Sequence, residues 1–364
     1  MGKASDAPLP RENAYFVGHE AAEKTFLDAW ESGRLAHAWL INGPEGIGKA
    51  TLAYRMARHL LSRTYSDLRL GLFDEALPTT LQMNPDHPVF KKVAAMGHSD
   101  IRVVERPWAD TKQSKRKTVI GVNEVREIGA FMRLTPGEGG WRVVIIDAAD
   151  EMNRNAANAV LKVLEEPPQR ALLFLVSHNS ARLLPTIRSR CRKLSLGPLD
   201  SSTIASLAQR YRPGLDKTEI NSLAVLADGS IGRALKLADI GGLDLFRQVT
   251  SVLGTLPKLD IGMAHALGDT AAKGESFRTV ADLLIWWLAR MVNLEARNKW
   301  MDTPEIIPGE HAIAKKLKDS ASLDHWVEVW EKVGRLFNRA DAVHLDKKRT
   351  ILNALLTIEQ TATG

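Results

Sequence analysis

Cysteine is almost absent from this chain of 364 residues, which contains only one, Cys191. A single cysteine cannot form a disulfide within the chain or build a multi-cysteine zinc site. No run of apolar residues approaches the roughly 20 that a membrane-spanning helix needs. The first fifteen residues also lack the apolar core of a secretion signal. We therefore expect a cytoplasmic protein without contact to a membrane.

Neither sign of charge dominates the sequence. The 49 basic and 43 acidic residues give a net charge of +6, which permits contact with nucleic acid but does not demand it. With 45% hydrophobic and 25% charged residues, the composition is that of an ordinary globular protein. The length exceeds that of one ordinary core, so two or three domains are expected.

The chain does contain a phosphate-binding loop, GPEGIGKA at residues 43–50, in which one position is altered. The pattern G-x-x-x-x-G-K-[ST] uses glycines to bring backbone N–H groups to a phosphate, a lysine to reach the outer phosphates and a hydroxyl to hold Mg²⁺. Ala50 stands where the hydroxyl belongs. Gly43, Gly48 and Lys49 match the pattern, and Gly46 is a third glycine of the loop that we expect at the nucleotide-binding site.

The flanks of this loop predict a nucleotide-binding fold. Residues 37–42 form a short apolar run typical of a buried strand, and residues 50–61 carry apolar side chains at helical spacing. This order favours a true loop over a glycine-rich turn that happens to contain lysine. Thr51 follows Ala50, but successive helix residues are rotated by about 100°, so we expect its hydroxyl to point away from the metal.

A second altered position follows the next strand. The β-branched run at 143–146 ends in Asp147, the layout in which a buried parallel strand presents a carboxylate beside the loop to organise Mg²⁺ hydration. In hydrolysing proteins of this class a glutamate usually follows, but this chain has Ala148. The next acid, Asp150, lies too far along the chain to replace it. The sequence therefore predicts no intrinsic ATPase activity.

Three further segments carry a resemblance to a known family. An apolar strand at 172–176 is followed by the polar residues 177–179, expected at the same sheet edge as the loop. The motif NAVLKVLEEPP occupies residues 158–168, and the triplet Ser-Arg-Cys occupies 189–191. Together with the degenerate loop, these motifs resemble the delta-prime family of bacterial DNA polymerase III clamp-loader subunits, which are AAA+ proteins. The resemblance extends from about Phe16 to the C-terminus.

The resemblance implies an α/β P-loop AAA+ core with a small helical lid and an all-α C-terminal collar domain. It also implies that Arg190, in the Ser-Arg-Cys triplet, acts as an arginine finger in the ATP site of a neighbouring motor subunit. Arg233, in the segment DGSIGRAL at 228–235, matches a lid arginine that senses bound nucleotide. The alternatives are that Arg190 is structural at a strand edge and that Arg233 only holds the lid against the core.

The chain departs from the family between residues 63 and 118. Many clamp-loader subunits carry a four-cysteine zinc module there, so we expect a zinc-free insertion, either a loop or a small subdomain. His87 and His98 have no cysteine partners, and a metal role for them is not expected. The basic run at 112–117 either meets DNA phosphate or an acidic partner or is a solvated loop.

Glycine and proline residues between the expected elements predict the domain boundaries. The core is expected over 1–197, the lid over 198–241, ending at a Gly-Gly pair, and the oligomerising collar over 242–364. Residues 200–202 are available to cap the first lid helix. In the collar, apolar stripes at helical spacing are expected to be core, although the resemblance implies that part of the apolar surface joins subunits. The residues of these stripes are Trp286, Trp287, Trp326, Trp330, Val333 and Phe337.

The function implied by the resemblance is that of a delta-prime-like subunit of the DNA polymerase III holoenzyme. It would assist ATP-dependent loading of the sliding clamp onto primed DNA, with motor subunits and delta as partners. No cofactor is required, and the residues leave open whether the loop binds ADP or ATP weakly. Two alternatives remain: an autonomous AAA+ ATPase, and a scaffold that neither binds nucleotide nor contributes to catalysis.

Overall fold

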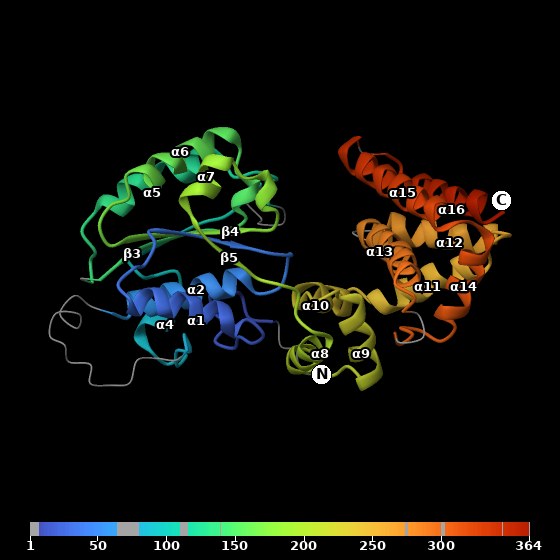
Figure 1. Cartoon of the computed structure of the whole chain (residues 1–364), viewed down its shortest axis with the longest axis horizontal. Coiled ribbons are helices and arrows are strands. Elements are labelled where there is room, and N and C mark those ends of the chain that lie inside the picture. Colours follow the sequence, from blue (N-terminus) through green and yellow to red (C-terminus); the bar gives the residue numbers. More distant parts are fainter. Residues whose placement is uncertain are drawn as a thin grey trace. The chain divides into compact units, whose positions relative to one another are not determined.

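The computed structural model of the chain describes residues 7–63, 80–109, 116–138, 140–273, 276–299, 303–343 and 345–363. The chain divides into two compact units (Figure 1). The first consists of residues 1–211 and 228–233, and the second of residues 212–227 and 234–364. The expected boundaries at 197 and 241 therefore stay a prediction.

The first unit is built on a five-stranded parallel sheet with the order β2-β3-β4-β1-β5. Its strands are β1 (Ala38–Asn42), β2 (Ile101–Val104), β3 (Arg142–Ile146), β4 (Ala171–Ser177) and β5 (Arg192–Ser195). The strands expected at 37–42, 143–146 and 172–176 are confirmed to within one residue at each end. Because all strands are parallel, their carboxyl ends meet at one edge of the sheet.

Helices cover both faces of this sheet (Figure 1). On one face lie α1 (Glu20–Glu31), α2 (Lys49–Leu61) and α4 (Pro88–Ala94), and on the other lie α5 (Val122–Arg133), α6 (Arg154–Glu165) and α7 (Pro185–Arg190). Side chains of β1 alternate accordingly: Trp39 and Ile41 belong to the apolar cluster of the first face, and Ala38 and Leu40 to that of the second. The predicted α/β core is confirmed.

The expected insertion at 63–118 needs a correction. Its residues 101–104 are β2, an edge strand of the main sheet that pairs in parallel with β3. His87 caps α4 by accepting a hydrogen bond from the Val89 N–H at 3.2 Å, and buried His98 accepts one from the Asp100 N–H at 3.1 Å. Residues 64–79 and 110–115, which include most of the basic run at 112–117, lie outside the described residues.

Three further helical elements follow strands of the first unit. Two 3₁₀ turns, η1 (Ala149–Glu151) and η2 (Ser180–Arg182), follow β3 and β4, and α8 (Ser201–Tyr211) follows β5. The predicted cap of α8 is confirmed, because the Thr203 N–H donates to Asp200 Oδ1 at 2.8 Å.

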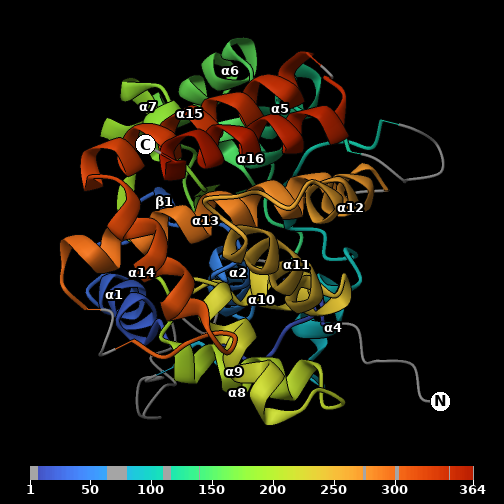
Figure 2. The same cartoon turned by 90° about the vertical axis from the view of Figure 1, so that its right-hand side faces the viewer.

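The second unit is helical. It comprises α9 (Lys217–Leu226), most of α10 (Ile231–Asp239), α11 (Gly242–Gly254), α12 (Ile261–Ala272), α13 (Ser276–Ala296), α14 (Glu310–Ser320), α15 (Leu323–Val343) and α16 (Lys347–Thr363). Within the unit, α15 and α16 lie side by side, α13 packs against α15, and α12 packs against α16 (Figure 2). These helices share one apolar core, which also includes Leu223 and Leu226 of α9 and Leu237 of α10.

The four tryptophans expected to be core residues pack into the core of this unit. Trp287 and Trp326 are fully buried, and Trp286 and Trp330 pack half-buried against the same core. Trp287 and Trp326 therefore offer no exposed surface for subunit contact, and the apolar contact between subunits that the resemblance implies stays a prediction. Among the described residues of the unit, the exposed large apolar side chains are Ile240, Ile261, Met263, Val343, Leu345 and Leu356.

Candidate functional site

The phosphate-binding loop connects β1 to α2 and depends on its glycines. Gly46 and Gly48 have φ values of +75° and +103°, in the region that side chains rarely adopt. A Cβ on Gly46 would collide with the Ser230 hydroxyl oxygen, and one on Gly48 would lie 3.1 Å from the ring of Phe16. The loop thus has the backbone that the motif predicts, and close neighbours surround it.

Lys49 is folded back onto its own loop. Its side chain is buried, and its ammonium group donates hydrogen bonds to the Gly43 carbonyl oxygen at 2.7 Å and to the Pro44 carbonyl oxygen. Burial lowers the pKa of Lys49 to about 8, although the carboxylates of Asp147 and Asp150 act in the opposite direction. The Lys49 amine therefore donates its hydrogen bonds to carbonyl oxygens of its own loop.

The segment 228–233 forms two hydrogen bonds to backbone carbonyl groups of the loop. Ser230 Oγ donates to the Glu45 carbonyl oxygen at 2.7 Å, and the Gly232 N–H donates to the Gly46 carbonyl oxygen at 2.9 Å. Ser230 Oγ in turn accepts from the Arg233 N–H at 3.1 Å, which caps the start of α10. The backbone of the half-buried Arg233 therefore lies next to the residues that contact the loop, and its role toward nucleotide stays a prediction.

The acids after β3 have separate roles. Asp147 follows the strand directly, and burial raises the pKa of its carboxyl group. Ala148 adopts the left-handed conformation, with φ at +62°, and is buried. Asp150 accepts hydrogen bonds from the backbone N–H groups of His178 at 2.9 Å and Asn179 at 3.0 Å. Asp150 therefore ties β3 to the end of β4 and is not placed as a substitute for the missing glutamate.

Two positions of this site lack the side chains that metal-dependent ATP hydrolysis usually uses. Ala50 and Ala148 offer no side-chain oxygen to a metal or to water, and the Lys49 amine donates to two carbonyl oxygens of the loop. Thr51 is buried within α2. Among the described residues, no group of three or more His, Cys, Asp or Glu side chains is arranged to hold a metal ion. The backbone of the loop nevertheless keeps the glycine geometry that phosphate binding uses.

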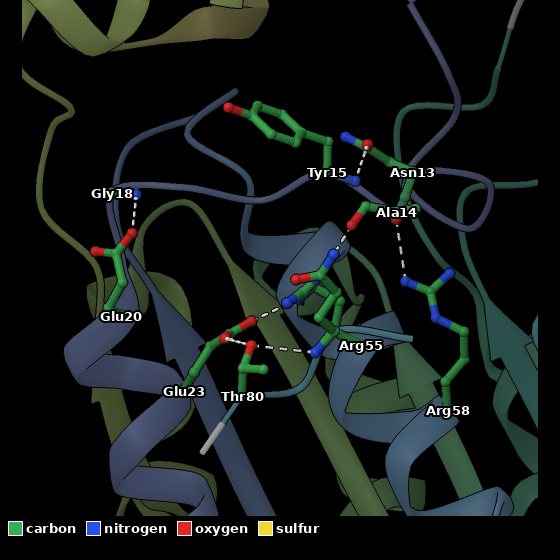
Figure 3. Close-up of polar contacts among 10 residues, drawn as sticks. Asn13, Ala14, Tyr15, Gly18, Glu20, Glu23, Arg55, Arg58 and Thr80 are labelled. Carbon is green, nitrogen blue, oxygen red and sulfur yellow. Dashed lines mark hydrogen bonds and ion pairs between the residues drawn. The ribbon is translucent and has the colours of Figure 1, made fainter. Parts of the chain in front are cut away.

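Two buried arginines of α2 hold the N-terminal segment (Figure 3). Arg55 pairs with Glu23 of α1 and donates to the Ala14 carbonyl oxygen at 2.9 Å. Arg58 donates to the carbonyl oxygens of Arg11 and Asn13, both at 3.0 Å. Sequence reasoning missed this contact, although two arginines within an otherwise apolar helix were its visible sign.

The N-terminal segment also supports the back of the loop. The His19 ring lies 2.9 Å from the Ile47 carbonyl oxygen through Nε2, and burial lowers the pKa of this histidine. Phe16 packs beside Gly48. The loop is consequently fixed by three parts of the first unit: its own lysine, the segment 228–233 and the N-terminal residues.

Arg190 lies away from this loop. It is the last residue of α7 and precedes β5 by one residue, whereas the loop follows the carboxyl end of β1. Strands β1 and β5 are parallel, with Trp39 opposite Arg192 and Asn42 opposite Ser195. Arg190 therefore lies near the amino-terminal ends of the strands, separated from the loop at their carboxyl ends by the length of a strand, roughly 15 Å.

The side chain of Arg190 is 37% exposed and contacts its own chain at two points. Nη2 lies 3.1 Å from Glu165 Oε1 at the end of α6, and Nη1 donates to the Thr186 carbonyl oxygen at 3.1 Å. Glu165 is itself 51% exposed, so the ion pair is at the surface. Lys49 and Asp147 thus lie at the carboxyl ends of the strands, whereas Arg190 lies at the opposite ends.

A family model described as "DNA polymerase III, delta subunit" matches residues 18–200, half of the chain. The chain belongs to this family. The matched range contains the loop, Asp147, the LEEPP motif and Arg190, so membership and the resemblance drawn from these motifs agree. Among the helices that the structure describes, none is long and apolar enough to cross a membrane.

Individual relatives are similar over part of their length. DNA polymerase III subunit delta' of Pseudomonas aeruginosa is 33% identical over 62% of this chain and 63% of its own length. DNA polymerase III subunit gamma of Buchnera aphidicola is 27% identical over 63% of this chain and 58% of its own. A gamma-subunit-related protein of Thermotoga maritima has a structure covering 95% of this chain and 100% of its own, with 18% identity and a TM-score of 0.38.

Proposed function

We propose that this chain is a delta-prime-like subunit of a cytoplasmic DNA polymerase III clamp loader. In this role it assembles with motor subunits and delta, and it assists ATP-dependent loading of the sliding clamp onto primed DNA. The chain itself does not hydrolyse ATP, and it needs no cofactor of its own. Family membership supports the complex, and the altered loop supports the division of labour within it.

The observation that carries the proposal is the position of Arg190. An exposed guanidinium at the sheet edge opposite the loop cannot reach a phosphate in its own loop, but it is available to an adjacent subunit. A guanidinium placed on a γ-phosphate stabilises the charge of the transition state. Its planar fork of donors suits phosphate better than the point charge of lysine. Arg190 therefore acts in trans as an arginine finger.

The rival function of an autonomous AAA+ ATPase conflicts with the chemistry of the loop. Two positions that usually hold metal or activate water are Ala50 and Ala148, and the nearest spare acid, Asp150, is engaged with two backbone N–H groups. Weak binding of ADP or ATP remains compatible with the glycine backbone. If a phosphate binds, Lys49 must release its two carbonyl partners first.

The rival function of a scaffold rests on the ion pair between Arg190 and Glu165. If that pair only joins α7 to α6, Arg190 is structural and the subunit contributes shape alone. Exposed ion pairs of this kind usually contribute only about 0–1 kcal/mol to stability, however, so stability alone is a weak explanation for an arginine at this position.

Measurements of ATP turnover separate the three functions. We expect the purified chain to hydrolyse ATP at the background rate, and Lys49→Ala to leave clamp loading by the assembled complex almost unchanged. Turnover by the isolated chain that Lys49→Ala abolishes would instead identify an autonomous ATPase. Purification of the chain from cells, followed by mass spectrometry of what accompanies it, tests the proposed partners. Recovery without any clamp-loader subunit would contradict them.

A further inference from the structure

Glu165 and Arg190 join two motifs that are 25 residues apart in the sequence. Glu165 is the last residue of α6, and Pro167 follows shortly after and ends that helix. Arg190 is the last residue of α7. Helices α6 and α7 lie on the same face of the sheet and pack against each other (Figure 1). The ends of both helices therefore bring a carboxylate and a guanidinium within 3.1 Å.

The contacts of Arg190 hold only part of its guanidinium group. Among the described residues, Glu165 meets Nη2 and the Thr186 carbonyl oxygen meets Nη1. Arginine carries five N–H donors in a fixed fork, so donors remain for an incoming anion. The side chain is anchored at two points while it stays 37% exposed.

We propose that Glu165 is a positioning residue that orients Arg190 for a phosphate group of a neighbouring subunit, an inference that rests on the proposed function. An unanchored arginine at a surface samples many rotamers and loses that freedom when it binds. The ion pair with Glu165 restricts the side chain before the anion arrives. Because both groups are partly exposed, the pair is weak enough for the guanidinium to shift onto the phosphate.

The neighbouring residue Glu166 provides a matched control. It is also a glutamate at the end of the same helix, but its carboxylate is 83% exposed and lies 3.8 Å from Arg133. Replacing either glutamate with glutamine removes one negative charge and retains side-chain size. A general effect of charge at this end of α6 would therefore appear in both variants, whereas orientation of Arg190 requires Glu165 alone.

The test is a double-mutant cycle in the assembled complex, with ATPase stimulated by clamp and primed DNA as the readout. We expect Glu165→Gln to lower the part of the rate that depends on Arg190 by about two- to fivefold, as for loss of one exposed ion pair. Glu166→Gln leaves the rate unchanged. In the Arg190→Ala background, Glu165→Gln has no further effect, because the side chain that it orients is gone.

Each other outcome has a distinct meaning. If Arg190→Ala itself leaves the rate at the wild-type value, the proposed function fails. If Arg190→Ala lowers the rate and Glu165→Gln does not, only the positioning role is wrong. An equal loss in both backgrounds identifies Glu165 as merely structural, and a rise in rate identifies it as a competitor of phosphate. Both of these results overturn the inference.

Discussion

Gly46 of the phosphate-binding loop and Gly232 at the start of α10 pack backbone against backbone. The Gly232 N–H donates to the Gly46 carbonyl oxygen at 2.9 Å. A Cβ on Gly232 would lie 2.9 Å from the Gly46 Cα, and a Cβ on Gly46 would lie 3.1 Å from the Gly232 Cα. The absence of side chains at both positions lets the segment 228–233 reach the loop.

This contact predicts the effect of Gly232→Ala. The added methyl group meets backbone atoms, which move less readily than a side-chain tip, so we expect a loss of about 1–3 kcal/mol in the free energy of unfolding. Urea denaturation of the purified chain measures it. Gly214→Ala is the control, because a Cβ there meets no heavy atom within 4 Å. Equal stabilities of the two variants would show that the loop does not need the close approach.

Lys49→Met tests the buried amine through pH. Lys49 has a pKa of about 8 in the folded chain and 10.5 ordinarily, so the unfolded chain binds the proton more tightly between these values. The wild type therefore carries a penalty below pH 8, on the order of 3 kcal/mol, that fades as the pH rises above 8. We expect the stability of Lys49→Met relative to wild type to fall between pH 7 and pH 9.5.

The control for this measurement is Lys24→Met. Lys24 is an exposed lysine whose pKa is raised by a hydrogen bond to Asp28, so it keeps its proton throughout that range. A difference between Lys49→Met and wild type that stays constant from pH 7 to pH 9.5 would mean that Lys49 does not titrate near pH 8.

Glu23→Ala tests the anchor of the N-terminal segment. Glu23 and Arg55 form a buried ion pair, with side chains 9% and 4% exposed (Figure 3). Removal of the carboxylate leaves a buried guanidinium without its charged partner, which costs about 3 kcal/mol. On the same helix, Asp28→Ala removes an exposed pair with Lys24 and should leave the urea midpoint unchanged. Similar midpoints for both variants would refute the role of burial.

Strands β1, β3 and β4 were predictable because their side chains are apolar in unbroken runs, as buried parallel strands require. Residues 143–146 and 172–176 are examples, and the cap at Asp200 was equally visible. The two edge strands, β2 and β5, contain charged residues and were not predicted. Hydrogen-bond partners that are distant in the sequence could not be predicted. Spacing placed Asp150 too far for catalysis but could not show that it binds the N–H groups of His178 and Asn179, because tertiary packing sets those contacts.

Burial likewise decides the role of several predicted residues. Sequence placed Lys49 toward phosphate, but only the folded loop places its amine against the Gly43 carbonyl oxygen. An apolar stripe cannot by itself distinguish core from interface, and Trp326 is core.

The expected boundary near 241 has a consequence for truncation: a chain ending at Ile240 would expose Leu223 and Leu237, which pack with α11–α16.

The most direct test of the central claim is the ATPase of the assembled complex with Arg190 replaced. Arg190→Ala and Arg190→Lys should both fold and assemble normally, since the side chain is at the surface. Both should lower the rate stimulated by clamp and primed DNA, because lysine lacks the planar fork of guanidinium. On the proposed function the loss should be partial, because other subunits of the complex would supply arginine fingers of their own. Wild-type rates of ATP hydrolysis and clamp loading in both assembled variants would contradict the account.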